Sequence, residues 1–384
     1  MSSANPAHPM PSTGGTASPA WWRGFLAPVA VAIISAIIAA VALRIGAGDL
    51  SPIPPADSPS GWSADAQAIH RVATVEWLAE SLQSADGRIT IVDLSSPARY
   101  AEEHIPGAVH GWWQDGMDPH ARAYGERYVV DTDPDGRAAW FAALGIEPGT
   151  TVVAYDDRGN VHASRLVWLL VDSGHADAMI LDGGLAAWKG AGWAVESDAS
   201  EIPNVPAEIA GHDNLAVVTT PELEAILASP QPDTVVVDVR TESERADTLK
   251  GVLPIGAIPG SVWLPRDGLY REDRLLRSPE ELRQMIADAG LDPDDTIVVY
   301  GRFGIDTGLP WLIMTTIGYD DVRIYDQGWV TWAEGDSRPI EPLQGTVPEQ
   351  AVRKTATVER SHRSPLTMRS LHVRHTVPGH IDGR

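Results

Sequence analysis

The sequence predicts an α/β protein with two tandem domains, each a parallel sheet covered by helices, preceded by one transmembrane helix. Three features of the chain predict this architecture: a set of landmarks that occurs twice, short apolar runs that alternate with amphipathic segments, and one long uncharged apolar stretch near the start. The first feature sets the number of domains, the second sets their fold class, and the third indicates a membrane anchor.

The two domains are predicted from four landmarks that recur in the same order. ITIVDL returns as TVVVDV, HIPGA as AIPGS, TVVAY as TIVVY, and LDGGLAAW as YDQGWVTW. The spacing between the copies is nearly constant, as it is from Tyr155 to Tyr300. Repetition of several landmarks at one spacing indicates a duplicated unit. We assign the first domain to residues 67–198 and the second to residues 215–342.

The fold class of each domain follows from its pattern of apolar runs. Runs of Val and Ile alternate with amphipathic stretches such as TTPELEAILAS and SPEELRQMIADAG. Continuous apolar strands separated by helices are typical of a parallel sheet that is buried on both faces. Thr220 and Ser278, each followed by Pro and Glu, are predicted helix N-caps. The functional loops are therefore expected at the carboxyl ends of the strands.

The N-terminal region is predicted to anchor the chain in a membrane. Residues 1–23 are rich in Ser, Pro, Ala and Gly and are expected to be disordered. Residues 24–43 are uncharged and long enough to cross a bilayer as a helix, with a cleaved signal peptide or a buried soluble helix as alternatives. Residues 44–66 read as a linker. Arg23 and Arg44 flank the span symmetrically, so only the short N-terminal tail favours a body outside the cytoplasm, on the periplasmic side.

Composition excludes several classes of function. The 384-residue chain has a formal net charge of -23, which argues against nucleic acid as a partner because phosphate binding needs clustered Lys and Arg. Small anions are not excluded, since a local nest of amides is insensitive to net charge. The chain has no cysteine, which excludes disulfides, thiolate nucleophiles and Cys-ligated metals. Residues 343–384 are locally basic and are predicted to be disordered. No cofactor and no metal site is predicted.

A glycine-rich loop, GRFGIDT, follows the strand TIVVY in the second domain and begins at Gly301. Its backbone amides and the N-terminus of the next helix would form a cradle that stabilises an anion, although many such turns bind nothing. A catalytic base at Asp306 is a weaker alternative. The predicted anion-binding or substrate-binding residues of this loop are Arg302, Phe303, Gly304, Ile305, Asp306 and Thr307.

The equivalent loop of the first domain is a poorer candidate for an anion site. It carries Asp156 and Asp157, whose carboxylates would repel an anion. His162 and Ser164 follow at once, and with Asp156 they suggest a nucleophilic triad. Such a triad needs a base that is held by a separate orienting group, and these three residues share one turn and helix start. His162 is therefore interpreted as a loop or cleft residue.

The order of the landmarks resembles the rhodanese family of tandem-domain sulfurtransferases over residues 70–340, with VDL, HIPGA, YDDRG and LDGGLAAW in the first copy. The resemblance implies two α/β domains, each with a five-stranded parallel sheet, that face one another across a cleft. It also implies a cysteine in the pattern C-R-x-G-x-x-[ST], whose thiolate takes sulfur from thiosulfate or mercaptopyruvate as a persulfide and passes it to an acceptor. Gly301 stands in place of that cysteine, and Asp156 fits the family's inactive first domain.

Other residues carry over from the resemblance one at a time. Arg165 matches the family's arginine that reaches across the cleft toward the substrate anion, with a salt bridge to an acid as the alternative. Arg240 is predicted to line the cleft or to form a surface ion pair. His104 and Pro106 are predicted to be structural. Ala257 departs from the family's histidine, so the local hydrogen bonding of the second domain is expected to differ.

These observations predict a rhodanese-family homologue without the catalytic cysteine, a membrane-tethered pseudoenzyme that binds a small sulfur-containing anion or a protein partner between its domains. The alternative is an active thiosulfate or 3-mercaptopyruvate sulfurtransferase, of which this chain is an altered copy. A purely structural assembly domain, without any affinity for anions, is a third hypothesis.

Overall fold

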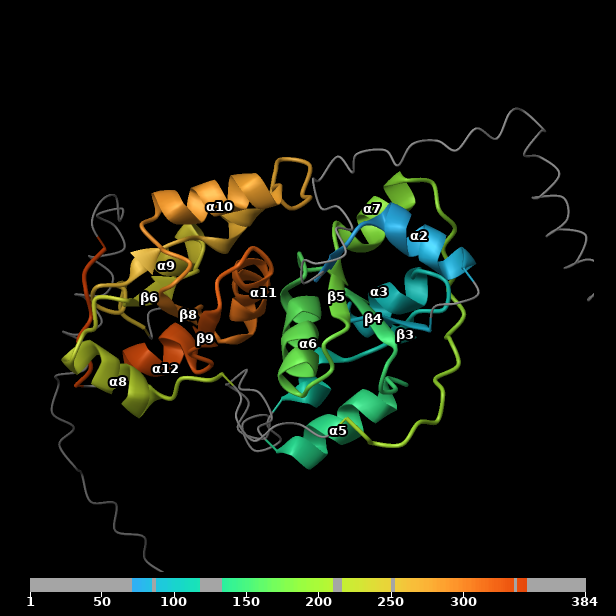
Figure 1. The fold of residues 1–384 in the computed structure, drawn as a ribbon, viewed down its shortest axis with the longest axis horizontal. Helices are drawn as coiled ribbons and strands as arrows, with labels where there is room; N and C mark the ends of the chain where they lie inside the picture. The colour runs from blue at the N-terminus through green and yellow to red at the C-terminus, as the bar shows by residue number, and fades with distance from the viewer. Residues whose placement is uncertain are drawn as a thin grey trace, which may run out of the picture. The chain divides into compact units, whose positions relative to one another are not determined.

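The computed structural model describes residues 71–84, 88–117, 133–209, 216–249, 253–334 and 337–343. They form two α/β units, the first half (residues 71–209) and the second half (residues 216–343) (Figure 1). Four predicted segments lie outside the described residues: the tail 1–23, the span 24–43, the linker 44–66 and almost all of the basic tail 343–384. Within the described ranges, none of the helices has the length and apolar character needed to cross a membrane.

The first half contains a five-stranded parallel sheet, as the family resemblance implied, and its strand order is β1-β5-β4-β2-β3. The central strands β2 and β4 pair along their whole length, from Ile89 opposite Thr151 to Asp93 opposite Tyr155. The five strands are β1 Val72–Ala73, β2 Ile89–Asp93, β3 Val109–His110, β4 Thr151–Tyr155 and β5 Ala178–Leu181.

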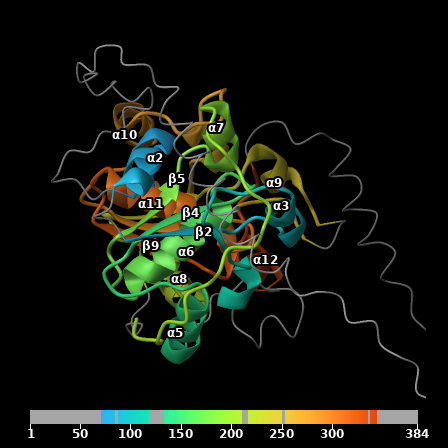
Figure 2. The same cartoon turned by 90° about the vertical axis from the view of Figure 1, so that its right-hand side faces the viewer.

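Helices cover both faces of this sheet (Figure 2). They are α2 Val75–Gln83, α3 Pro97–Glu102, the 3-10 helix η2 Trp113–Gly116, α5 Pro134–Ala143, α6 Val161–Asp172 and α7 Gly184–Gly190. Alternate residues of β4 face opposite layers: Val152 and Ala154 belong to the cluster with α5 and α6, and Val153 and Tyr155 to the cluster with α2 and α7. A strand buried on both faces must be apolar throughout, which explains the TVVAY run.

The sheet of the second half has four parallel strands in the order β7-β6-β8-β9. The prediction of five strands is therefore wrong for this half. A single parallel bridge between Val217 and Ile324 stands where β1 lies in the first half. The Val218 amide donates to the Ile324 carbonyl at 2.8 Å, but the pairing does not extend to a second bridge. The four strands are β6 Thr234–Asp238, β7 Val262–Trp263, β8 Thr296–Tyr300 and β9 Asp321–Ile324.

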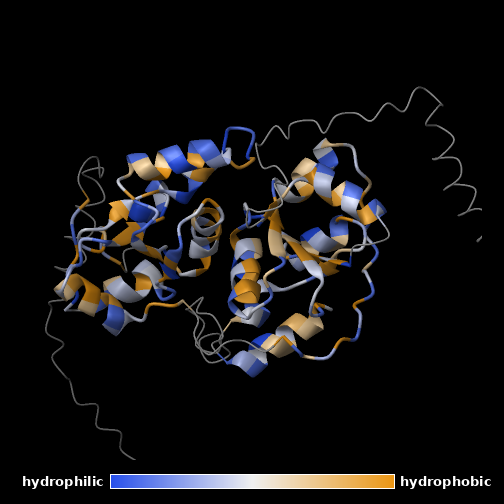
Figure 3. Cartoon of the chain, viewed as in Figure 1, coloured by the Kyte–Doolittle hydropathy of each residue, from blue (hydrophilic) through white to orange (hydrophobic). Residues whose placement is uncertain are grey.

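The helices of the second half repeat the arrangement of the first. They are α8 Thr220–Ala228, α9 Glu242–Ala246, the 3-10 helix η3 Arg266–Leu269, α10 Pro279–Asp288, the 3-10 helix η4 Ile305–Thr307, α11 Gly308–Thr316 and α12 Gly328–Glu334. Helix α10 is amphipathic, with Leu282 and Ile286 buried against the core and polar residues on its outer side (Figure 3). This is the alternation that the sequence predicted.

One of the two predicted helix caps is confirmed and the other is wrong by one residue. Ser278 caps α10 and its side chain accepts a hydrogen bond from the Glu281 amide. The cap of α8 is Thr219, whose backbone amide and hydroxyl donate to Glu222 at 2.8 and 2.7 Å. Thr220 is instead the first helical residue. The reason is the position of the glutamate, which stands three residues after Thr219 as a capping box requires.

The repeated IPG landmark is anchored by the same contact in both halves. The buried Tyr155 hydroxyl accepts a hydrogen bond from the Ile105 amide at 3.0 Å, and the Tyr300 hydroxyl accepts one from the Ile258 amide at 3.1 Å. Both tyrosines end the strand that feeds the loop of interest. The two halves therefore share the hydrogen bond that holds the tyrosine at the end of this strand.

The replacement of His104 by Ala257 has a local effect. His104 pairs with Glu196, and Ala257 pairs with Glu341, each through two backbone hydrogen bonds. The His104 ring adds a hydrogen bond between Nδ1 and the carbonyl of Tyr100 at 2.7 Å, which alanine cannot make. The local hydrogen bonding of the two halves therefore differs at this position, as expected.

Helices α6 and α11, which follow the two loops, pack against each other, and α6 also contacts η4. Their apolar side chains, such as Leu169 and Leu312, belong to one hydrophobic cluster that continues into both sheets. Residues of α6 therefore lie within reach of the loop that precedes α11.

Candidate functional site at the second-half loop

The loop between β8 and α11 is fixed to helix α12. The carbonyl of Gly301 accepts a hydrogen bond from the Trp329 amide at 2.9 Å, and the carbonyl of Arg302 accepts one from the Val330 amide at 3.2 Å. Both donors lie in the first turn of α12, where the amides have no partner within the helix. The start of the loop is thus held by the element that follows the sheet's last strand.

The loop turns at Gly304, a position that only glycine can occupy. Its φ is +57°, and a Cβ atom there would lie 2.7 Å from the carbonyl carbon of Asp326. A residue with a side chain would be strained by its backbone conformation and would also meet this neighbour. The glycine is therefore explained by the close approach of the two backbone segments.

The space beside Gly301 is filled by the carboxylate of Asp306. A Cβ atom on residue 301 would lie 2.5 Å from Cγ and 2.8 Å from Oδ2 of Asp306, closer than atoms in contact approach each other. Asp306 is 5% exposed, and its Oδ2 accepts a hydrogen bond from the Arg302 amide at 3.1 Å. The loop thus holds a carboxylate at the place where a side chain of residue 301 would begin.

One half-buried arginine compensates this carboxylate in part. Arg266 lies 3.4 Å from Asp306 Oδ2, but its two terminal nitrogens donate to Glu244 at 2.5 and 2.6 Å. Asp306 Oδ1 has no hydrogen-bond partner among the described residues. Burial raises the pKa of Asp306 above its usual value, and the nearby Arg266 opposes this shift. The arrangement is therefore a buried acid whose charge is only partly satisfied.

The structure brings Arg165 to this loop, where it makes the salt bridge to an acid that was the alternative to substrate binding, so a role in anion binding stays a prediction. Its guanidinium donates to the carbonyl of Gly304 at 3.3 Å and forms a buried ion pair with Asp326. The guanidinium also lies over the Trp168 ring, with Cζ 4.7 Å from the ring centroid. The arginine thus reaches the loop across the two halves, and its charge is matched by an acid of the second half.

The remaining predicted residues of the loop are also engaged by the protein itself. Arg302 donates to Asp247 at 2.6 Å and lies over the Phe303 ring, with Cζ 5.2 Å from the ring centroid. The Thr307 hydroxyl donates to the Gly304 carbonyl, and the Ile305 side chain is half-buried. A role of these residues in anion binding stays a prediction.

Arg240 lies apart from the loop, inside the second half. It is fully buried, and its Nε and one terminal nitrogen donate to Asp238 at 2.9 and 2.7 Å. Cζ lies 4.4 Å from the centroid of the Trp329 ring. The guanidinium therefore supports the end of β6 from within the core.

The equivalent loop of the first half also holds a carboxylate, supplied by Asp156. Its Oδ1 accepts hydrogen bonds from the amides of Arg158 and Asn160 at 2.7 and 2.8 Å. Its Oδ2 accepts hydrogen bonds from the amides of His162 and Ala163 at 2.6 and 3.0 Å. These are amides at the loop and at the start of α6, which would otherwise be unsatisfied. From the sequence, the Asp156 carboxylate was expected to repel an external anion. In the structure this carboxylate itself occupies the place of a bound anion.

His162 lies near this loop in a stacked arrangement. Its ring is stacked on Trp113, with 4.9 Å between the ring centroids. Burial lowers its pKa, although the nearby Asp156 opposes the shift. The Ser164 hydroxyl donates to the Val161 carbonyl at 3.3 Å. The nucleophilic triad that we rejected from the sequence is absent here, since these side chains make other contacts.

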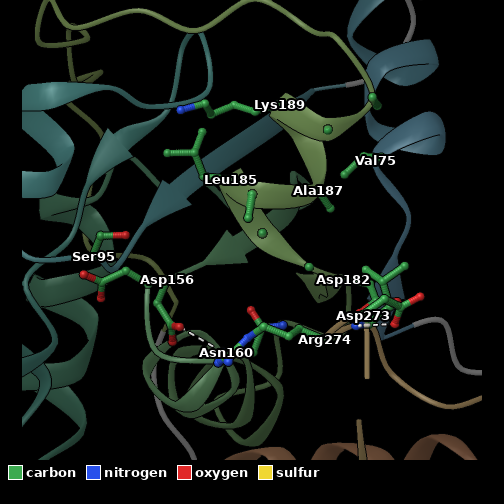
Figure 4. A pocket seen from close by; sticks show the side chains of 18 of the residues that line it. Val75, Ser95, Asp156, Asn160, Asp182, Leu185, Ala187, Lys189, Asp273 and Arg274 are labelled. Atoms are coloured by element: carbon green, nitrogen blue, oxygen red, sulfur yellow. Dashed lines mark hydrogen bonds between the residues drawn. The ribbon is translucent and has the colours of Figure 1, made fainter. Parts of the chain in front are cut away.

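A cavity of about 880 Å³ lies beside the first-half loop, and residues of both halves line it (Figure 4). The loop residues Asp156 and Asn160 form one wall, α7 forms another, and the segment 270–275 of the second half closes it. The Asp182 carboxylate faces this region and accepts a hydrogen bond from the Leu276 amide at 3.0 Å, and burial raises its pKa to about 6.

Sequence reasoning missed this cavity. The acids at the carboxyl ends of β4 and β5 were visible in the sequence, but the contribution of the segment 270–275 depends on how the halves meet. The described residues contain no group of three or more His, Asp or Glu with the geometry of a metal site.

Comparison with protein families decides where the chain belongs. The model of the rhodanese-like domain matches residues 74–191 and 219–335, which is most of each half. The chain belongs to the rhodanese-like family. Its two rhodanese-like domains stand in tandem, as the repeated landmarks predicted.

Several relatives of this rhodanese-like protein are named as sulfurtransferases. It is 30% identical to the thiosulfate sulfurtransferase of Pseudomonas aeruginosa over 255 residues, covering 66% of this chain and 91% of the relative. It is 26% identical to the 3-mercaptopyruvate sulfurtransferase of Escherichia coli O157:H7 over 280 residues, covering 70% of this chain and 97% of the relative. Nearly the whole length of each relative is therefore represented.

The fold is similar to that of EanB. Its wild-type structure matches with a TM-score of 0.61 at 22% sequence identity, covering 72% of this chain and 70% of that chain. At this identity the likeness concerns the fold, and it agrees with the two parallel sheets described above.

The chemistry of this rhodanese-like site is limited by residue 301. Sulfur transfer through a persulfide needs a thiolate that attacks and then carries the sulfur. The chain contains no cysteine, and Gly301 stands at the position that the family pattern assigns to the nucleophile. What the loop retains is the turn at Gly304, the nearby arginines Arg165 and Arg302, and a carboxylate in the place of the missing side chain.

Proposed function

We propose that this chain is a membrane-tethered rhodanese-family pseudoenzyme that binds between its domains without transferring sulfur. Its ligand is a small sulfur-containing anion or a protein partner. The body is held by the span 24–43 on the extracytoplasmic, periplasmic side of the membrane. The proposal combines family membership, the missing thiol and the apolar N-terminal stretch.

The observation that carries the proposal is the contact between Gly301 and Asp306. The loss of a nucleophile alone would leave a vacant space beside residue 301. Instead the Asp306 carboxylate fills it, at 2.5 Å between Cγ and the position of a Cβ atom. A cysteine at residue 301 would overlap this group, and its thiolate would also be destabilised by the adjacent negative charge. The present side chains therefore suit a loop without a nucleophile.

Charge pairing around the loop favours a protein partner over a free anion. Arg165 pairs with Asp326, Arg302 pairs with Asp247, and Arg266 is shared by Glu244 and Asp306. An incoming anion needs a positive charge that is not already compensated. In the wild-type protein each of these arginines already has a carboxylate neighbour.

The alternative is an active thiosulfate or 3-mercaptopyruvate sulfurtransferase, of which this chain is an altered copy. Relatives named for these activities align over 91% and 97% of their lengths, which favours a retained scaffold. The two proposals make opposite predictions for a variant that restores the thiol.

The test is sulfur transfer from thiosulfate and from mercaptopyruvate to cyanide, measured on full-length protein. We expect no transfer by the wild type and little by Gly301→Cys, because Asp306 obstructs the new side chain. The double variant Gly301→Cys with Asp306→Ala is expected to exceed the single variant by about tenfold or more, since it gains both space and a better thiolate. Transfer by the wild type above the uncatalysed rate would contradict the pseudoenzyme, and efficient transfer by Gly301→Cys alone would support the alternative.

The membrane tether is tested separately. Full-length protein is expected in the membrane fraction and a chain beginning at residue 60 in the soluble fraction. Protease added to intact spheroplasts should degrade the body if it lies on the periplasmic side. Equal distribution of the two chains between the fractions would contradict the tether.

A further inference from the structure

The two strand-to-helix loops, residues 156–160 and 301–307, differ in sequence but share a buried carboxylate. We infer that Asp306 is an internal ligand that occupies the anion-binding cradle of the second-half loop and excludes external oxyanions from it. The inference rests on the proposed non-catalytic role of the site and specifies how that site is occupied. The class of ligand that Asp306 excludes is a small oxyanion such as thiosulfate or sulfate, which leaves the protein partner of the two ligands proposed above.

The first half shows what such an internal ligand looks like when it is fully satisfied. The Asp156 side chain starts at the last position before the turn and receives four backbone amides, two on each oxygen. Successive amides that converge on one oxyanion are a general anion-binding arrangement. In this loop the bound oxyanion is covalently part of the chain.

The second half reaches the same result by a different route. Its residue at the position of Asp156 is Gly301, which has no side chain to place in the loop. Asp306, five residues later, directs its carboxylate back toward Gly301, and the Arg302 amide donates to it at 3.1 Å. Since the two carboxylates originate at different sequence positions, the sequence repeat alone does not relate them.

The second carboxylate is held less completely than the first. One backbone amide donates to it, Arg266 lies 3.4 Å away, and Oδ1 has no hydrogen-bond partner within the described ranges. Only 5% of the Asp306 surface is exposed, so bulk water does not hydrate the unpaired Oδ1. Its donors are one amide and an arginine that Glu244 shares, and both become available to another acceptor when the carboxylate is removed.

Removal of the carboxylate exposes two groups that an oxyanion uses. The Arg302 amide loses its acceptor, and Arg266 keeps only Glu244. Both face the space that the side chain of Asp306 vacates. A thiosulfate or sulfate ion can then accept hydrogen bonds from them, with the rigid turn at Gly304 already in place.

The experiment is calorimetric titration of full-length protein with thiosulfate and, separately, with sulfate at constant ionic strength. The wild type is compared with Asp306→Ala, which empties the cradle, and with Asp306→Asn, which removes the charge but keeps the volume. The matched control is Asp247→Ala. It removes one negative charge beside Arg302, at an exposed position outside the cradle.

We expect Asp306→Ala to bind thiosulfate at least about tenfold more tightly than the wild type, a change of about 1.4 kcal/mol. Asp306→Asn and Asp247→Ala should gain less than threefold, since neither empties the space. Near-ultraviolet circular dichroism identifies any variant that has lost its packing, and the Asn variant then supplies the comparison of charge alone. Wild-type binding as tight as that of Asp306→Ala, or an equal gain in Asp247→Ala, would overturn the internal ligand.

These outcomes are distinct from a failure of the proposed function. Turnover of thiosulfate by the wild type contradicts the pseudoenzyme and is measured in the cyanide assay. The binding experiment involves no turnover, so a folded Asp306→Ala variant without any gain in affinity contradicts the internal ligand alone.

Discussion

The two loops that follow β4 and β8 hold a carboxylate in the same part of the fold, and they hold it very differently. Asp156 receives four backbone amides, whereas Asp306 receives one amide and lies near an arginine that Glu244 already engages. The duplicated loops thus both surround a carboxylate, but different sequence positions supply it. In the first half both carboxylate oxygens receive hydrogen bonds from backbone amides. In the second half only one oxygen does.

The largest effect that tests this comparison is expected at Asp156. Replacement by alanine leaves four amides without their acceptor at a site where the side chain is almost fully buried. We expect Asp156→Ala to lower the free energy of unfolding by about 3 kcal/mol. Asp306→Ala should change it by less than about 1 kcal/mol, because the lost contacts are offset by removal of a poorly solvated charge. Chemical denaturation measures both values, and similar losses at the two positions would contradict the comparison.

A smaller effect on stability is expected at Gly301, where Asp306 leaves no room for a side chain. Gly301→Ala introduces a Cβ atom that overlaps the Asp306 carboxylate, and we expect a loss of about 2 kcal/mol. In the Asp306→Ala background the same substitution should cost about 0.5 kcal/mol, because the obstructing group is gone. The double-mutant cycle thus has a coupling energy of about 1.5 kcal/mol. Additive losses would mean that Asp306 moves aside without cost.

Much of the fold was predictable because it depends on local patterns. The apolar runs before Tyr155 and Tyr300 set the central strands, and the glycines after them indicated tight turns into helices. The shortened sheet of the second half was not predictable, because Val217 has the same local character as a strand residue. Its pairing nevertheless stops at one bridge with Ile324, although Thr219 caps its helix at the same spacing from Val217 as Thr74 does from Val72.

The candidate site was predicted in its location but not in its occupancy. The sequence placed Arg165 and the loop after Tyr300 at one site, and the structure brings them together. It gave no sign that the Asp306 carboxylate returns to Gly301, since this contact depends on the φ of Gly304 and on the approach of Asp326. The buried location of Arg240 was also missed, because pairing with Asp238 two residues earlier looks the same in sequence as a surface ion pair.

The smallest expected effect concerns the pH dependence of stability. Burial raises the pKa of Asp306 above its usual value of 3.8, so the folded state holds its proton more tightly than the unfolded state does. Between 3.8 and the raised pKa the folded state therefore binds more protons, and the contribution of Asp306 to stability falls as the pH rises through this window. Asp306→Asn cannot ionise and lacks this contribution. The free energy of unfolding of the wild type, relative to this variant, is thus expected to decrease from pH 4 upward and to level off once the folded-state carboxyl has ionised. Urea denaturation of both proteins across this range measures the difference. A difference that increases with pH would mean that Arg266 stabilises the charged carboxylate more than burial destabilises it, and Asp306 would then be as well satisfied as Asp156.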